Sequence, residues 1–237
     1  MSKHAFIFGS NYKGTQYELS ACVKDCVRIS NEFTKRGYVI NKNWSENPLN
    51  WWMLNINFQK FLGSLKSGDF ALIYYSGHGF QVIDDDSDET DNKDECIYIS
   101  EKLYITDDNL RESLQSIASG VNVLLVFDCC NSGTIADLSY KLNNLSSIKE
   151  NTFTFKANIV SISGCPDPNY SYEANGTGLL TDSFLKTLDL WEPKIYPSFP
   201  WIDFYIRVSS HLLDVTNNEQ FPQLAFSNPD ILKTCWL

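Results

Sequence analysis

The sequence has 237 residues, which is long enough for one large α/β domain with a substantial buried core. Nineteen Lys and Arg against 29 Asp and Glu give a net charge of -10, which disfavours binding to nucleic acid or an anionic membrane and favours basic substrates or metal cations. No stretch is apolar and long enough for a signal peptide or a membrane span, so we expect a soluble, cytoplasmic protein.

Strands and helices are expected to alternate along the chain. Strands are predicted at 4–8, 38–40, 70–75, 96–99, 103–105, 121–127, 158–162 and 223–226, and helices at 20–36, 49–66, 106–120, 179–190 and 199–213. The pattern predicts an α/β sandwich in which a central, mostly parallel sheet is flanked by helices. We interpret residues 1–237 as a single domain.

Two stretches have no predicted element. Residues 84–95 hold eight acidic side chains and one Lys, which indicates either a solvated loop or a calcium site. An EF-hand is excluded, because Glu89 stands where that motif needs a glycine for its turn. Residues 134–156 are polar and lack periodicity, so we expect a long functional or cleavable loop.

A thiol and an imidazole follow the ends of two apolar runs. The run 121–127 is continuously apolar, as in a strand buried on both faces, and Cys130 lies three residues beyond it. The run 70–75 is similar and leads to His78. If both strands lie in one parallel sheet, the two side chains emerge at the same edge, where open α/β sheets bind ligands. This pairing predicts a cysteine nucleophile with its base.

The other histidines are poorer candidates for the base. His4 opens its strand and is expected at the opposite edge, and His211 lies on a late helix among polar residues. His78 also stands between two glycines, which permit close backbone approach and leave amides such as that of Gly79 free to bind an oxyanion.

The choice among the cysteines stays open on residue patterns alone. Cys129 and Cys130 alternate, so one of them is expected to face the imidazole. Cys165 also follows a strand and is a weaker alternative, whereas Cys22 and Cys26 lie on the apolar side of a helix. Seven cysteines without paired C-x-x-C spacing predict free thiols rather than a disulfide framework or a zinc ribbon.

Several motifs resemble those of the metacaspases, which are caspase-like cysteine peptidases. YYSGHG at 74–79 is similar to their histidine motif and DCCNSGT at 128–134 to their cysteine motif. Further similar segments are LSACVKDC at 19–26, SGCPD at 163–167 and FPQLAFS at 221–227. The order of these motifs is that of the family. The resemblance therefore implies a caspase-like fold, with parts 1–140 and 157–237 similar to the large and small caspase subunits and a polar loop at 141–156.

The resemblance also implies the roles of individual residues. Cys130 is the expected nucleophile and His78 the general base and acid, with amides of Gly79 and Cys130 at the oxyanion. Metacaspases cleave polypeptides after Arg or Lys. The positions that match their acidic substrate pocket are Asp25 and Asp128, with Ser76 and Cys22 beside them.

Calcium activation is a further expectation from the resemblance. The matching carboxylate ligands are Asp94, Asp107, Asp108 and Asp137, although the acids of 107 and 108 also suit a helix N-terminus. The resemblance implies a compact, monomeric member without a proline-rich prodomain. Two alternatives remain: a catalytically silent regulatory module, and a calcium-binding or thiol-redox sensor.

Overall fold

The computed structural model describes residues 1–83, 93–143, 145–165, 171–174, 176–191 and 199–234. The acidic stretch expected to be a solvated loop or a calcium site lies mostly outside these residues, as do Asp167 and Cys235. Among the helices described, none has the length and apolar character needed to cross a bilayer.

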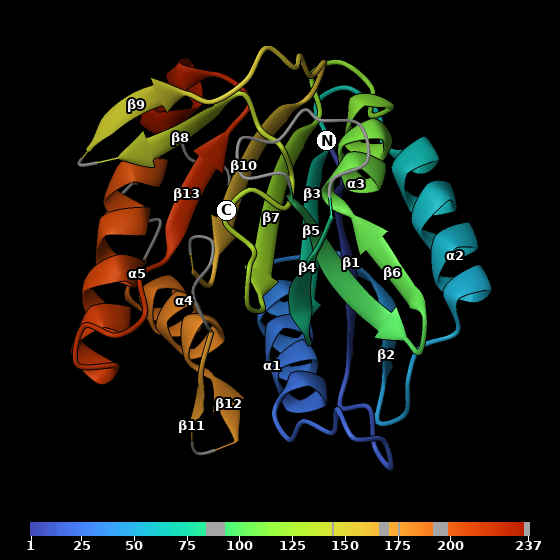
Figure 1. Ribbon diagram of the computed structural model, residues 1–237. Helices are drawn as coiled ribbons and strands as arrows, with labels where there is room; N and C mark the ends of the chain where they lie inside the picture. Colours follow the sequence, from blue (N-terminus) through green and yellow to red (C-terminus); the bar gives the residue numbers. More distant parts are fainter. Residues whose placement is uncertain (84–92, 144, 166–170, 175, 192–198, 235–237) are drawn as a thin grey trace.

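An eight-stranded sheet forms the centre of the molecule, in the order β2-β1-β3-β7-β10-β13-β8-β9 (Figure 1). The strands are β1 Lys3–Ser10, β2 Val39–Ser45, β3 Phe70–Ser76, β7 Asn122–Asp128, β8 Tyr140–Asn143, β9 Ser146–Lys149, β10 Asn158–Ser163 and β13 Gln223–Phe226. The pairings from β2 to β10 are parallel. Those from β10 to β9 are antiparallel, so the sheet is mixed.

Helices cover both faces of this sheet, as expected for an α/β sandwich (Figure 1). The helices are α1 Cys22–Lys35, α2 Trp51–Ser64, α3 Asp107–Gln115, α4 Leu179–Leu190 and α5 Trp201–Val215. Buried residues of α1, α4 and α5 form one apolar cluster with the sheet, and those of α2 and α3 form the other.

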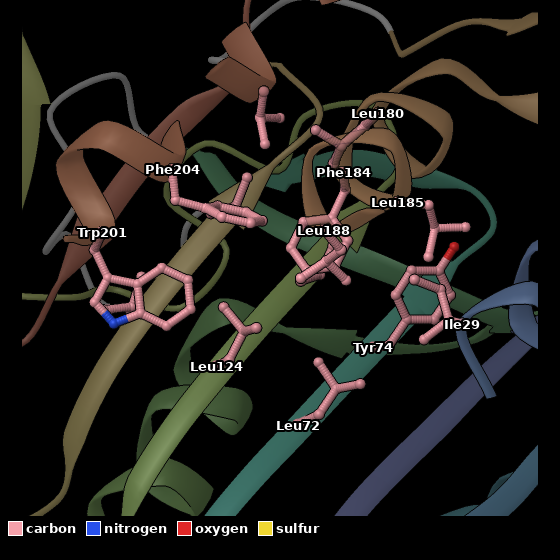
Figure 2. Packing of buried hydrophobic residues seen from close by; sticks show 14 of the residues in the cluster. Ile29, Leu72, Tyr74, Leu124, Leu180, Phe184, Leu185, Leu188, Trp201 and Phe204 are labelled. Atoms are coloured by element: carbon pink, nitrogen blue, oxygen red, sulfur yellow. The ribbon is translucent and has the colours of Figure 1, made fainter. Parts of the chain in front are cut away.

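The two clusters explain the continuous apolar sequence of β7. Its Leu124 and Val126 lie in the cluster of α1, α4 and α5, whereas Leu125 and Phe127 lie in the other. Figure 2 shows Leu124 beneath side chains of α4 and α5, including Phe204. A strand that is buried on both faces shows no alternation of polar and apolar residues, so the prediction of a central strand is confirmed.

The expectation of an unstructured loop at 134–156 is wrong, because β8 and β9 form an antiparallel hairpin there. The hairpin extends the edge of the sheet, where Tyr140 stacks on Phe226 with ring centroids 5.9 Å apart. All four residues of β9 are exposed. An edge strand that buries neither face needs no apolar periodicity, which is why the sequence pattern missed it. The polar edge strand β2 was likewise predicted too short.

A small second sheet stands over the end of β3. The predicted hairpin is confirmed as β5 Lys93–Ser100 and β6 Leu103–Thr106, and β4 Gly79–Ile83 adds a third strand that was not predicted. The remaining short elements are β11 Glu173–Ala174, β12 Thr177–Gly178 and the 3-10 helix η1 Pro229–Lys233.

Candidate active site

The register of β3 and β7 brings the two chemical motifs together. Ser76 lies opposite Asp128 in the parallel pairing, so the residues two positions further on, His78 and Cys130, leave the sheet at the same edge. The backbones there are in close contact: a Cβ on Gly79 would lie 1.9 Å from the carbonyl oxygen of Cys130. Only glycine permits this approach, which explains the residue after the histidine.

The imidazole of His78 is oriented by a backbone carbonyl. Its Nε2 lies 2.8 Å from the carbonyl oxygen of Tyr17, which assigns the proton to Nε2 and leaves a lone pair on Nδ1. The ring of Tyr12 packs beside the imidazole with centroids 5.3 Å apart, and the hydroxyl of Tyr75 donates to the carbonyl of His78 at 2.9 Å. A base held by a third group is typical of nucleophilic catalysis.

The two adjacent cysteines differ in exposure. Cys129 is only 2% exposed and Cys130 is half-buried, and both line the same pocket. Burial raises the pKa of the Cys130 thiol, and the N–H of Ser171, 3.3 Å from Sγ, opposes that rise. A thiol with a raised pKa needs a base to become a nucleophile at neutral pH.

The side chains of His78 and Cys130 both line a pocket of about 130 Å³. Several of the residues predicted for substrate binding line it as well. The lining includes Cys22, Ser76, His78, Asp128, Cys130 and Glu173. Asp25 lies behind the lining, where its Oδ2 accepts the N–H of Gly178 at 2.6 Å. The structure therefore brings His78, Cys130 and the predicted acidic residues into one region.

Neutral donors of the chain surround the carboxylate of Asp128. Its Oδ2 accepts from the N–H and hydroxyl of Thr181 at 2.9 and 2.6 Å, and its Oδ1 accepts from the hydroxyl of Ser171 at 2.7 Å. Gly178 fits against this group, since a Cβ there would lie 2.1 Å from Oδ2. Burial raises the pKa of Asp128, and these hydrogen bonds oppose the rise.

The carboxylate of Asp25 is completely buried. Its Oδ1 accepts from the hydroxyl of Thr177 at 2.6 Å and lies 3.5 Å from Arg28. Burial, reinforced by the neighbouring charge of Asp128, raises the pKa of Asp25 to about 7. The two carboxylates thus form a buried acidic floor whose charge increases through neutral pH.

Two further residues of this region were missed from the sequence. Glu173 is exposed at the pocket, where its carboxylate accepts from the hydroxyl of Ser20 at 3.3 Å. Gln220 is completely buried and donates to Gly164 O and Ser171 Oγ at 2.9 and 3.0 Å. No local pattern marks Glu173, but Gln220 directly precedes the FPQLAFS segment and could have been found there.

Three of the four predicted calcium ligands lie together at the start of α3. Oxygens of Asp107, Asp108 and Asp137 lie within 4.8 Å of one another. Asp94, the fourth predicted ligand, is described by the structure but is not part of this group. Its neighbour Glu95 donates its backbone N–H to Oδ2 of Asp107 at 2.8 Å. Burial raises the pKa of Asp107. A set of adjacent carboxylates fits the preference of calcium for hard oxygen ligands.

The alternative histidines lie elsewhere. His4 is in the first half of β1, paired with Val39. His211 contacts the hydroxyl of Ser183 and the ammonium of Lys186, at 2.9 and 3.2 Å, and so links α5 to α4. Neither lines the pocket of Cys130.

The fold has counterparts of known structure. A crystal structure of a Geobacter sulfurreducens protein matches with a TM-score of 0.73 and 25% identity, covering 98% of this chain and 97% of that one. Caspase-1 from Spodoptera frugiperda matches with a TM-score of 0.61 and 12% identity, covering 94% and 86%. The expected caspase-like fold is confirmed. A family model described as Caspase domain (Peptidase_C14) matches residues 2–231, and the chain belongs to this family.

Curated relatives are metacaspases. Metacaspase-1 of Plasmodium falciparum is 35% identical over 193 residues, which are 73% of this chain and 31% of that protein. Metacaspase-7 of Arabidopsis thaliana is 30% identical, over 68% of this chain and 45% of that protein. Metacaspase-5 of Trypanosoma cruzi is 26% identical, over 95% and 57%. The chain thus spans about a third to just over half of these relatives, and the resemblance to metacaspases is confirmed.

Proposed function

We propose that the chain is a cysteine endopeptidase that cleaves polypeptides after Arg or Lys, with Cys130 as nucleophile and His78 as general base and acid. The observation that carries this proposal is the register of β3 and β7, which delivers both side chains to one pocket beside Asp128. Family membership and the metacaspase relatives support the same reaction class. We expect a monomer in the cytoplasm, to be checked by light scattering and fractionation.

The proposed reaction is acyl transfer. Nδ1 of His78 takes the proton from the thiol of Cys130, and the thiolate attacks the carbonyl carbon of the scissile peptide. The N–H groups of Gly79 and Cys130 donate to the developing oxyanion. His78 then protonates the leaving amine and afterwards removes a proton from the water that hydrolyses the thioester. The Tyr17 carbonyl keeps the imidazole in the tautomer that this sequence of steps needs.

The preference for a basic side chain follows from the charge of the pocket. Asp128 accepts hydrogen bonds from neutral donors, which do not cancel its negative charge, whereas Arg28 lies 3.5 Å from Asp25 and offsets part of that charge. Glu173 adds a third carboxylate at the pocket lining. A guanidinium or ammonium is attracted to such a site, whereas an acidic side chain is repelled.

Calcium activation is the second part of the proposal. Asp107 and Asp108 begin α3, and Asp137 belongs to the segment that follows Cys130. Asp137 has a left-handed backbone, with φ 44°, and its N–H donates to Thr134 O at 2.7 Å, so the segment makes a tight turn towards α3. Calcium supplies positive charge that these carboxylates would share. Calcium bound between α3 and this segment would reposition the chain next to the nucleophile and open the substrate groove.

The first test is release of a fluorophore from a peptide ending in Arg, compared with one ending in Asp, each with calcium and with a chelator. We expect turnover of the Arg peptide alone, and only with calcium. Turnover that a chelator leaves unchanged would contradict calcium activation but not the peptidase. No turnover of either peptide by folded protein would instead favour a regulatory module.

A further inference from the structure

The carboxylate cluster of Asp107, Asp108 and Asp137 already contacts a positively charged side chain, the guanidinium of Arg111. Nη1 of Arg111 donates to Oδ2 of Asp137 at 2.7 Å. Nη2 of the same guanidinium pairs with Oδ1 of Asp108, three residues earlier on α3. Arg111 therefore connects α3 to the segment that follows Cys130, and these two carboxylates are the same ones that the calcium proposal uses.

Packing holds the guanidinium in this position. The side chains of Arg111 and Asp137 are 12% and 5% exposed. The guanidinium carbon lies 3.9 Å from the ring centroid of Phe153, which is cation–π distance. An ion pair that is this well covered is weakened less by water and salt than one on the surface. Arg111 is thus an ordered part of the cluster.

A guanidinium and a calcium ion would compete for these carboxylates. Both neutralise Asp108 and Asp137, and both join α3 to the Asp137 segment. Like charges repel strongly at the short distances involved, especially where burial lowers the effective dielectric constant. Calcium can therefore bind these oxygens only after the guanidinium has moved away, and the energy needed to release it reduces the net affinity for calcium.

We propose that Arg111 is a tethered competitor of calcium, which sets the calcium concentration at which the cluster fills. This inference rests on the calcium part of the proposed function and names the residue that regulates it. In the absence of calcium, Arg111 holds the Asp137 segment against α3. When calcium binds, the guanidinium is released from Asp108 and Asp137.

The test is a calorimetric titration of the full chain with calcium chloride after removal of metal with a chelator. We expect Arg111→Gln to bind calcium about tenfold more tightly than the wild type, because about 1.4 kcal/mol of competing ion pairing is removed. Arg36→Gln is the matched control. Arg36 pairs with Glu32 at 2.9 Å, lies 5.3 Å from the Trp191 ring and is 16% exposed, so it has similar surroundings at the C-cap of α1. The control should bind calcium as the wild type does.

Thermal unfolding provides a second readout. In chelator, Arg111→Gln should unfold at a lower temperature than the wild type, because its carboxylates lose their positive partner, and calcium should raise its Tm by more. Phe153→Leu keeps the charge but loosens the guanidinium, so it should increase calcium affinity by a smaller factor. It also tests the proposal if Arg111→Gln does not fold.

The outcomes separate the inference from the function on which it rests. Equal or weaker calcium binding by Arg111→Gln and Phe153→Leu would overturn the competitor role and leave calcium activation intact. Absence of calcium binding in every variant would overturn both. Cleavage of the Arg peptide reports on the peptidase itself, independently of all these titrations.

Discussion

In the part of the chain that the structure describes, the largely buried carboxylates beside β7 and beside α3 are stabilised in different ways. At the end of β7, Asp128 accepts hydrogen bonds from Thr181 and Ser171, which are neutral donors. Near the start of α3, the buried Asp137 and the half-buried Asp108 contact the guanidinium of Arg111, a full positive charge. Neutral donors lower the cost of burying a carboxylate but leave its field in place, whereas a cation cancels the field. Asp128 can therefore still attract a basic substrate, whereas Asp108 and Asp137 must first release a cation.

The largest effect is expected from removing the thiol of Cys130, which lines the same pocket as Asp128. Cys130→Ala should abolish hydrolysis of the Arg peptide, because no other half-buried thiol among the described residues lines the pocket. Cys129→Ala should retain most of the activity, since Cys129 is 2% exposed and its pKa is raised well above the usual range. Initial rates with equal amounts of folded protein decide this. The reverse pattern would transfer the nucleophile assignment to Cys129.

The next largest effect is expected from removing the charge of Asp128. Asp128→Asn should lower kcat/KM for the Arg peptide by about a hundredfold, because a buried charge pair with the substrate is lost. The amide group would also face hydroxyl and N–H donors, so Tm should fall. Asp214→Asn is the control, because Asp214 is exposed on α5 and does not line the pocket. If both variants cleaved equally well, the uncompensated charge would not be the basis of specificity.

The surroundings of Asp128 could be predicted from the sequence only in part. The strand ends beyond β3 and β7 could be predicted, because continuous apolar runs must be buried and parallel strands share an edge. Ser76, Cys22 and Asp128 could be assigned to one pocket through the resemblance. The donors could not, because Thr181 and Ser171 come from segments far along the chain, and the carbonyl of Tyr17 belongs to the backbone and has no side-chain signature.

The cluster on α3 was predictable only in part for a related reason. Asp107 and Asp108 are adjacent in sequence, and Asp137 follows the cysteine motif, so the resemblance indicated all three. Arg111 looked like an ordinary helix residue, because its second partner lies 26 residues away. Strand β9 gave no signal at all, since it is exposed throughout.

A smaller effect is expected from the pH dependence of Asp25. Its pKa in the folded protein, about 7, lies above the ordinary value of 3.8, so the native state binds a proton more tightly than the unfolded state does. Its contribution to stability is therefore complete below pH 3.8 and is lost as pH rises through about 7. Asp25→Asn should raise Tm more at pH 8 than at pH 5, measured by scanning calorimetry.

The pH dependence of activity should also differ between the wild type and Asp25→Asn. A rise in pH should destabilise the wild type but increase its activity relative to the variant. As pH rises through about 7, Asp25 ionises and the attraction for a basic side chain increases. The wild type should therefore gain more in kcat/KM over this range than Asp25→Asn does. Identical pH profiles for the two proteins would show that Asp25 does not supply charge to the pocket.

The smallest effect is expected at Glu173, the exposed carboxylate of the pocket lining. Glu173→Gln keeps the shape of the side chain and can still accept from Ser20, but it removes a charge at the pocket. Because Glu173 is exposed, water and salt screen its field, and KM for the Arg peptide should rise only about two- to fivefold. The rise should shrink at high salt, where the effect of Asp128→Asn should persist because Asp128 is buried. Equal salt sensitivity of the two variants would contradict the distinction between a buried floor and an exposed rim.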